Sequence, residues 1–196
     1  MLLTKTLIHT EKSALWTVEN FSEDYYETLK EVFCYEEPPI IIANRECRQR
    51  RNVAFYSDES EGYKYSGQTM KSLPLSNVPL FPLLLEEINN SLNTNFNGIL
   101  VNRYINGEKY LSAHSDDEHG LDKNNKMVVG LSYGPGIRNF RIRDKVTKEI
   151  ILNYDQKPCT LLVMQGEFQK EFTHEIPIQK LIKEERISLT FRNHIV

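Results

Sequence analysis

Apolar and polar residues follow two different patterns along this chain, and the change falls near residue 98. From Gly98 onward, short apolar or alternating segments recur between turn signals such as Asn106-Gly107 and Gly134-Pro135-Gly136. The predicted strands are Gly98–Tyr104, Met127–Tyr133, Asn139–Arg143, Glu149–Leu152, Thr160–Gln165 and Arg186–Arg192. Short strands at this spacing are typical of an antiparallel sandwich or barrel.

The first 97 residues are mixed, and two segments there have helical periodicity. The segment Ser22–Phe33 begins with a serine that suits a helix N-cap, continues with acidic residues, and places apolar residues at helical spacing. A second segment, Pro82–Leu92, has one apolar side, and Asn95-Phe96-Asn97-Gly98 predicts its end. Helices before a run of antiparallel strands predict an α+β fold, a double-stranded β-helix (jelly roll) with the N-terminal helices packed on one outer face.

Length and composition narrow the class of protein. A chain of 196 residues suits one domain over residues 1–196, in which residues 1–97 precede a β-rich core of residues 98–196. A net charge of −3 argues against attachment to nucleic acid by bulk charge, but leaves a local basic patch open. Cys34, Cys47 and Cys159 form no CxxC pair, which favours free thiols. The apolar stretches are too short for a signal peptide or a membrane span, so we expect a soluble intracellular protein of the nucleus or cytoplasm.

The chemistry-bearing residues centre on His114-Ser115-Asp116, followed far along the chain by His174. Residues i and i+2 of a strand share a face, so His114 and Asp116 can bind one metal ion from one strand. Two histidines and one carboxylate are the ligand set of non-heme Fe(II) oxygenases. The pattern therefore predicts an iron site completed by His174 from another strand.

The last predicted strand adds a second polar group. Its alternation places Arg186, Ser188, Thr190 and Arg192 on one face. Arginine presents a planar fork of donors that matches a carboxylate, so this face beside a metal predicts a receptor for a small dianion. Asn102 and Tyr104 share a face of an earlier strand and could complete the same hydrogen bonds. The alternative for Arg186 and Arg192 is a salt-bridged surface strand.

Two short basic segments, residues 45–51 and 138–145, concentrate cations in a chain that is acidic overall. A basic cluster is usually a solvated face. Here the two segments could form a local positive track for phosphates. The hypothesis predicts binding to oligonucleotides that weakens steeply with salt.

Several motifs together resemble one known family. They are Asn102-Arg-Tyr104, His114-Ser-Asp116-Asp-Glu118, His174, Arg186-Ile-Ser-Leu-Thr-Phe-Arg192 and, upstream, Tyr63-Lys-Tyr65-Ser-Gly67. In these residues the chain resembles the AlkB family of 2-oxoglutarate- and Fe(II)-dependent nucleic-acid demethylases, most closely its eukaryotic DNA-repair branch. The resemblance is clear from Gly98 to Arg192 and looser before it.

The resemblance implies a role for each matching residue. The metal ligands would be His114, Asp116 and His174, which with Arg192 form the catalytic group. The 2-oxoglutarate pocket would consist of Asn102, Tyr104, Arg186, Ser188, Thr190 and Arg192, although Ser188 stands where the family commonly has asparagine. The substrate would be contacted by Arg51, Tyr63, Tyr65, Glu118 and Arg143. Among these, the two tyrosines belong to a nucleotide-recognition lid and hold the target base with His114, Glu118 reads its exocyclic amino group, and the two arginines contact the backbone.

The implied activity is oxidative demethylation of bases such as 1-methyladenine and 3-methylcytosine, in single- or double-stranded DNA or RNA, by a monomer with Fe(II) and 2-oxoglutarate as cofactors. Three alternatives stay open. The same oxygenase mechanism could act on a protein or a small molecule, or the chain could be a non-catalytic nucleic-acid binder with a degenerate iron site. Two histidines and an aspartate could also hold zinc in a hydrolase.

Overall fold

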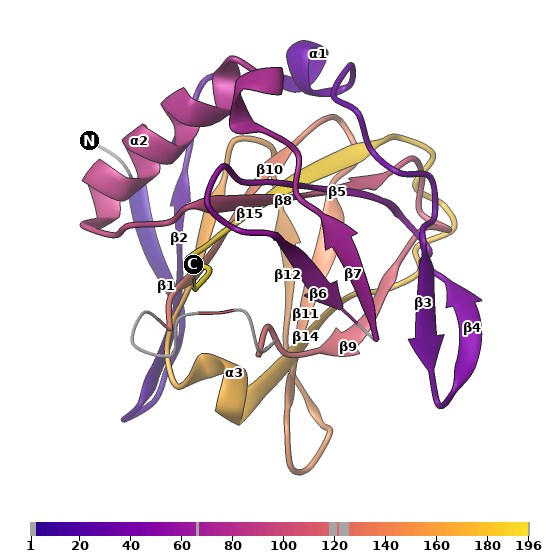
Figure 1. The fold of residues 1–196 in the computed structure, drawn as a ribbon. Helices are drawn as coiled ribbons and strands as arrows, with labels where there is room; N and C mark the ends of the chain where they lie inside the picture. Colours follow the sequence, from indigo (N-terminus) through magenta and orange to yellow (C-terminus); the bar gives the residue numbers. More distant parts are fainter. Residues whose placement is uncertain (1–2, 66, 118–120, 122–125, 196) are drawn as a thin grey trace.

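Antiparallel strands dominate the computed structural model, which describes residues 3–65, 67–117, 121 and 126–195. Within these residues a seven-stranded sheet contains, in spatial order, β1 (Leu3–His9), β2 (Ser13–Glu19), β13 (Leu161–Gly166), β10 (Val128–Tyr133), β15 (Arg186–Arg192), β8 (Gly98–Tyr104) and β5 (Asn52–Tyr56). A smaller sheet contains β12 (Ile150–Gln156), β11 (Arg138–Asp144), β14 (Phe172–Ile176) and β9 (Leu111–His114). The small sheet lies beneath the large one in Figure 1, as in a jelly roll.

The large sheet contains strands from both sides of residue 98. Its strands β8 and β15 have the predicted bounds, and β10 and β13 lie within one residue of theirs. Strands β1, β2 and β5 come from the first 97 residues and were not predicted. All of Val53–Tyr56 in β5 is buried, and a strand that is buried on both faces lacks the alternation that identifies a half-exposed one.

Helix α2 (Leu80–Leu92) begins two residues before the predicted helix and ends at the predicted residue. Pro82 lies in its first turn, where a missing backbone N–H costs no helical hydrogen bond, and Asn93 ends it in the left-handed conformation. Its buried face, which includes Phe81 and Ile88, belongs to one hydrophobic cluster with Ile99 of the large sheet. In Figure 1, α2 lies on the side of the large sheet away from the small sheet.

The helix predicted over Ser22–Phe33 is wrong in extent, because only α1 (Tyr26–Leu29) forms, a single turn. The Ser22 hydroxyl lies 2.8 Å from the Tyr133 hydroxyl and caps no helix. The Asp24 carboxylate instead accepts a hydrogen bond from the Tyr26 backbone N–H. Tertiary contacts of these polar residues outweigh a weak local helix propensity.

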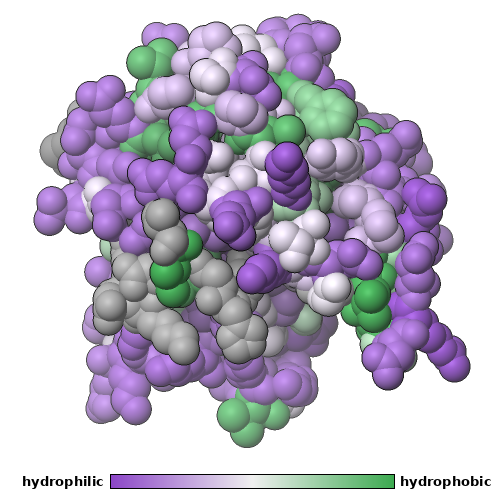
Figure 2. Space-filling model, viewed as in Figure 1, coloured by the Kyte–Doolittle hydropathy of each residue, from purple (hydrophilic) through white to green (hydrophobic). Residues whose placement is uncertain are grey.

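Two short hairpins and two small helical segments complete the fold. The hairpins pair β3 (Pro39–Ile42) with β4 (Arg45–Arg48), and β6 (Gly62–Tyr65) with β7 (Gln68–Lys71). The helical segments are η1 (Leu75–Asn77) and α3 (Phe168–Glu171). Figure 2 shows that the face carrying both hairpins is mostly hydrophilic, with hydrophobic residues in separate patches. Among the described residues, no helix has the length and apolar character needed to span a membrane.

Candidate active site

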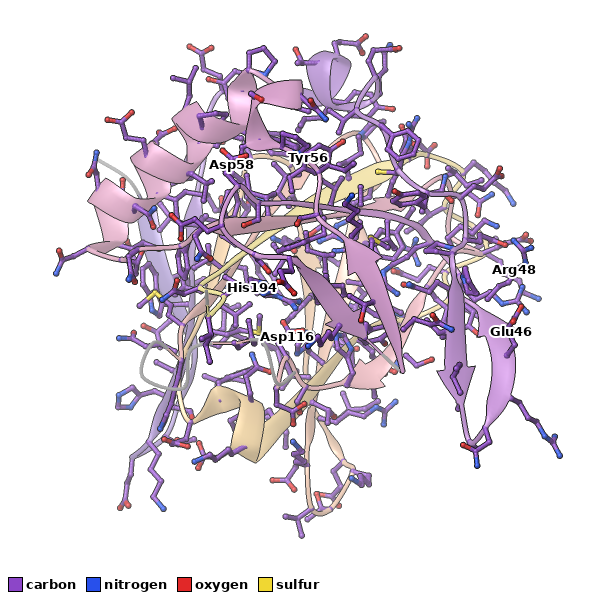
Figure 3. The ribbon with its side chains drawn as sticks, viewed as in Figure 1. Glu46, Arg48, Tyr56, Asp58, Asp116 and His194 are labelled. Atoms are coloured by element: carbon purple, nitrogen blue, oxygen red, sulfur yellow. The ribbon has the colours of Figure 1, made fainter. Side chains whose placement is uncertain are left out.

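Three metal-binding side chains meet between the two sheets. His114 ends β9, Asp116 follows it, and His174 on β14 lies opposite His114 in the sheet register. Nε2 of His114 lies 3.5 Å from Oδ1 of Asp116, and Nε2 of His174 lies 3.6 Å from Oδ2. One potential ligand atom from each residue lies within 4.8 Å of the others. Donors bound to one ion at about 2.0–2.2 Å have separations of this size. Figure 3 shows Asp116 in the interior of the molecule.

The protonation states of this cluster suit a divalent metal. Burial lowers the pKa of His174 to about 3, so the imidazole is neutral at pH 7. Burial also opposes ionisation of Asp116, but the nearby Arg192, His174 and His114 outweigh it and hold the pKa of that carboxyl well below its usual range. Metal ligands of these types bind as neutral imidazole and as carboxylate. The donor set therefore fits Fe(II), as the sequence predicts.

Neighbouring groups fix the orientation of the three side chains. Nδ1 of His114 lies 2.9 Å from the Ser112 carbonyl oxygen, and donation from this atom leaves Nε2 with its lone pair toward Asp116. The Asp116 backbone N–H donates to the Gln169 side-chain oxygen, and the Phe140 ring stacks on His174 with centroids 5.2 Å apart. No sequence pattern indicated Gln169 or Phe140, because only the packing of α3 and β11 places them here.

Arg186 is a buried cation whose hydrogen-bond acceptors are neutral. Its guanidinium donates to Ser132 Oγ at 2.9 Å and to Gln156 Oε1 at 2.7 Å, and lies 5.6 Å from the Tyr104 ring centre. Burial lowers the pKa of Arg186 to about 10, so it stays charged at neutral pH. Among the described residues no carboxylate pairs with it, and a buried charge needs a counterion. An anionic ligand would supply that counterion.

The predicted cofactor residues line the same cavity as the metal cluster. Asn102, Tyr104, Ser188, Thr190 and Arg192 face it together with the metal ligands. At Gly130, also on its wall, a side-chain methyl would meet no atom within 4 Å, so this glycine borders open space. The cavity therefore joins a three-donor metal site to a cationic receptor, as a dicarboxylate bound beside a metal requires.

Arg192 lies between the metal-binding residues and the two tyrosines of β6. Its Nη2 donates to Asp116 Oδ1 at 2.8 Å, and its guanidinium carbon lies 5.3 Å from the Tyr63 ring centre. The rings of Tyr63 and Tyr65 stack with centroids 5.9 Å apart and an interplanar angle of 11°, and Tyr65 meets His114 edge to face. These side chains thus gather beside the three metal-binding residues, and their role in holding a base stays a prediction.

The two arginines predicted to contact a nucleic-acid backbone lie in different surroundings. Arg51 is only 2% exposed, donates to Asn102 Oδ1 at 2.6 Å and lies over the Tyr65 ring. It lines the cavity and is not at the surface where a phosphate would lie. Arg143 lies on β11 and pairs with Glu175 at 3.0 Å. Glu118, predicted to read the base, lies outside the described residues.

Comparisons with known proteins agree with this site. A family model described as the 2OG-Fe(II) oxygenase superfamily matches residues 1–192. The alpha-ketoglutarate-dependent dioxygenase alkB homolog 3 of Bos taurus is 33% identical over 153 residues, which are 74% of this chain and 52% of that protein. The DNA oxidative demethylase ALKBH2 of Homo sapiens is 26% identical over 149 residues, 72% of this chain and 56% of that protein.

The chain thus spans little more than half the length of these two curated relatives. The solved structure of OsALKBH1 has a TM-score of 0.60 at 14% identity, covering 97% of this chain and 100% of that one, which shows a shared fold. The family match covers nearly all residues, and the clustered His114, Asp116 and His174 supply the metal ligands that its description requires. This chain belongs to the 2OG-Fe(II) oxygenase superfamily.

Proposed function

We propose that this protein oxidatively demethylates N-methylated bases in DNA or RNA, with 1-methyladenine and 3-methylcytosine as substrates. The observation that carries the proposal is a single cavity lined by three kinds of group. They are the three metal-binding side chains, the buried Arg186, which has no carboxylate partner among the described residues, and the ring of Tyr63. Relatives whose names specify alpha-ketoglutarate dependence and DNA demethylation support it.

The cofactor would be oriented by the two sheets together. His114, Asp116 and His174 hold Fe(II), while Arg186 pairs with the distal carboxylate of 2-oxoglutarate. Asn102, Tyr104, Ser188 and Thr190 line that pocket. Arg192 donates a hydrogen bond to Asp116. It therefore lies where it could neutralise the 1-carboxylate of 2-oxoglutarate next to the metal.

When bound, Fe(II) and 2-oxoglutarate supply the oxidation of the methyl group by O₂, with release of succinate and CO₂. The hydroxymethyl group on nitrogen then leaves as formaldehyde, and the base is restored. The contribution of this chain is to position the methyl group and exclude water. The apolar Leu162 and Met164 on the cavity wall serve the second purpose.

The β6–β7 hairpin, defined by Gly62–Tyr65 and Gln68–Lys71, would act as the lid over the base. A base inside a duplex is out of reach, so the target is flipped out or already single-stranded. Tyr63, Tyr65 and His114 would hold it by stacking, and Glu118 would read its amino group. We also propose that the protein works as a monomer, in the nucleus or cytoplasm.

Phosphate contacts would come from the β3–β4 hairpin. All four residues of β4 are exposed, and its Arg45 and Arg48 have no ion-pair partner within the described part of the chain. Figure 3 shows Arg48 and Glu46 at the outer edge of the molecule. On β11, in contrast, Arg141 and Arg143 both pair with Glu175.

The direct test is turnover of a single-stranded oligonucleotide that carries one 1-methyladenine, with Fe(II), 2-oxoglutarate and O₂. We expect formaldehyde, succinate and unmodified adenine in equal amounts, and no products from Asp116→Ala. Succinate without repair of any methylated DNA or RNA oligonucleotide would contradict a nucleic-acid substrate and favour an oxygenase of proteins or small molecules. Absence of succinate from metal-loaded protein would contradict the oxygenase mechanism.

A further inference from the structure

A second cavity, of about 230 Å³, lies between the β3–β4 and β6–β7 hairpins. The hairpins approach at their ends, since a Cβ built at Gly67 would lie 3.3 Å from Ile41. The cavity walls include Tyr35, Gln49, Tyr63, Tyr65, Met70 and Lys71. Nothing in the reaction proposed above uses this space.

The walls of this cavity are aromatic, and it adjoins the catalytic cavity. Tyr35, Tyr63 and Tyr65 supply the rings, and the Met70 thioether supplies a polarisable contact for another ring. Tyr63 borders both cavities, and Tyr65 meets His114 edge to face. Tyr63 therefore forms part of a wall that the two cavities share, and Tyr65 stacks beside it.

Gln49 gives the second cavity a specific polar group. The residue is only 4% exposed, and it lines the cavity. The backbone N–H of Gln49 donates to the Pro38 carbonyl at 3.0 Å. Its side-chain Oε1 has no hydrogen-bond partner within the described residues. Leaving a buried acceptor unpaired costs free energy, so a ligand that donates a hydrogen bond is favoured here.

These features select a particular ligand. A flat ring fits aromatic walls, an exocyclic amino or ring N–H group matches Oε1, and a volume below the roughly 300–1,000 Å³ of pockets for drug-sized molecules suits one ring system. The exposed Lys71 on the wall has no ion-pair partner among the described residues and can face a phosphate. A nucleobase in a polynucleotide has all three properties.

We propose that the second cavity binds the nucleobase next to the methylated one, on one side of it along the strand. The inference rests on the proposed function, because it assumes that the methylated base occupies the catalytic cavity. Gln49 accepts a hydrogen bond from the neighbouring base, and Tyr35 and Tyr65 contact its ring. The enzyme then reads two successive bases, one on each side of the Tyr63–Tyr65 wall.

The test measures binding without turnover, using anaerobic protein loaded with Fe(II) and 2-oxoglutarate. Three single-stranded oligonucleotides carry one 1-methyladenine, with both neighbouring bases present, with the 5′ neighbour abasic, or with the 3′ neighbour abasic. Affinity is measured by fluorescence anisotropy. The wild type should bind one abasic oligonucleotide about 5- to 100-fold more weakly than the oligonucleotide with both neighbouring bases, and should bind the other abasic one equally well. A change below twofold on both sides would overturn the proposal.

Two variants and a control assign the effect to this cavity. Thr69→Trp fills the cavity from an exposed position and should abolish the difference in affinity between the intact and the abasic oligonucleotide. Gln49→Leu keeps the side-chain volume and should reduce that difference about two- to tenfold. Gln165→Leu makes the same chemical change at an exposed position on β13 and should bind like the wild type. Discrimination that persists unchanged in folded Thr69→Trp and Gln49→Leu would overturn the proposal.

Failure of this proposal can be distinguished from failure of the proposed function. If all three oligonucleotides are demethylated and bind with equal affinity, the second base site is contradicted and the proposed demethylation is supported. Loss of binding at one abasic position, with no repair under O₂, would keep the site and contradict demethylation.

Discussion

Two pairs of arginines, on β15 and β11, have opposite surroundings. Arg186 and Arg192 on β15 face the interior between the sheets and are almost fully buried. Arg141 and Arg143 on β11 are partly exposed and share the carboxylate of Glu175. The guanidinium of Arg186 instead has only neutral hydrogen-bond acceptors within the described residues. The comparison indicates that enclosure at a cavity wall without a carboxylate partner, and not the presence of arginine, marks a ligand site.

A third arginine shows that burial alone does not create such a site. Arg138, also on β11, is 0% exposed and donates to the carbonyls of Asn106, Lys109 and Pro177. These backbone acceptors belong to the loops at one end of the sheets. Its charge is therefore used to satisfy buried carbonyls, and the residue connects loops instead of binding a ligand.

The largest expected effect is on turnover, and it should differ between substitutions of two adjacent residues on β14. His174 is buried in the metal cluster, and Glu175 pairs with arginines on the other face of the small sheet. His174→Ala should lower turnover by more than the roughly 10- to 100-fold that loss of an outer-shell metal partner costs, because it removes a ligand itself. Glu175→Gln should retain most activity. The measurement is succinate formation with 2-oxoglutarate and O₂.

Thermal unfolding checks the same pair without relying on activity. A metal at about 100 times its Kd stabilises the folded state by roughly 2.7 kcal/mol. We expect this stabilisation in the wild type and in Glu175→Gln, and not in His174→Ala. Equal metal stabilisation of both variants would show that His174 is not a ligand.

The second largest effect concerns stability. Arg138→Met should lower the free energy of unfolding by about 3 kcal/mol, because it leaves buried carbonyls without donors, each costing about 1–3 kcal/mol before water or rearrangement compensates. Arg141→Met should change it by less than about 1 kcal/mol, as expected for a partly exposed ion pair. Denaturant unfolding of both variants measures the difference, and similar losses would contradict the role given to Arg138.

The third prediction addresses the cofactor. Arg186→Met should raise the KM for 2-oxoglutarate about 10- to 100-fold, since a charge-assisted hydrogen bond contributes about 1.5–3 kcal/mol. The thermal stability should fall little, because the variant replaces a buried charge by an apolar side chain. Arg141→Met is the matched control on β11 and should leave this KM unchanged. An unchanged KM in Arg186→Met would place the dicarboxylate elsewhere.

The smallest effect compares exposed and paired arginines. Arg48→Gln on β4 should reduce the magnitude of the salt dependence of oligonucleotide affinity by about one unit of slope, as loss of one phosphate contact does. Arg143→Gln should not, because that guanidinium is already held in an ion pair with Glu175. A titration of oligonucleotide affinity against salt concentration distinguishes the two variants. Equal slopes would contradict phosphate contacts by the β3–β4 hairpin.

Local patterns predicted the strands whose residues alternate between polar and apolar types from one face to the other. In β15, Ile187, Leu189 and Phe191 join the outer hydrophobic cluster while Arg186, Ser188, Thr190 and Arg192 line the cavity, and the predicted bounds are confirmed. Strand β5 has apolar residues at every position of Val53–Tyr56, so its sequence carries no comparable alternation. The helix predicted over Ser22–Phe33 was too long for a different reason. Polar side chains there form hydrogen bonds with residues far along the chain, as Ser22 does with Tyr133 and Tyr26 with Glu185.

The sequence by itself determined the chemistry available: two imidazoles, a carboxylate, and arginines at fixed steps along a strand. Residue type and alternation are local properties, so they could be recognised before any fold was known. Only the tertiary structure decided that Arg51 is enclosed, that Ser132 and Gln156 accept hydrogen bonds from Arg186, and that Gln49 faces a second cavity. Those facts depend on which strands pair and which hairpins meet, and long-range packing of this kind leaves no trace in the spacing of residues along the chain.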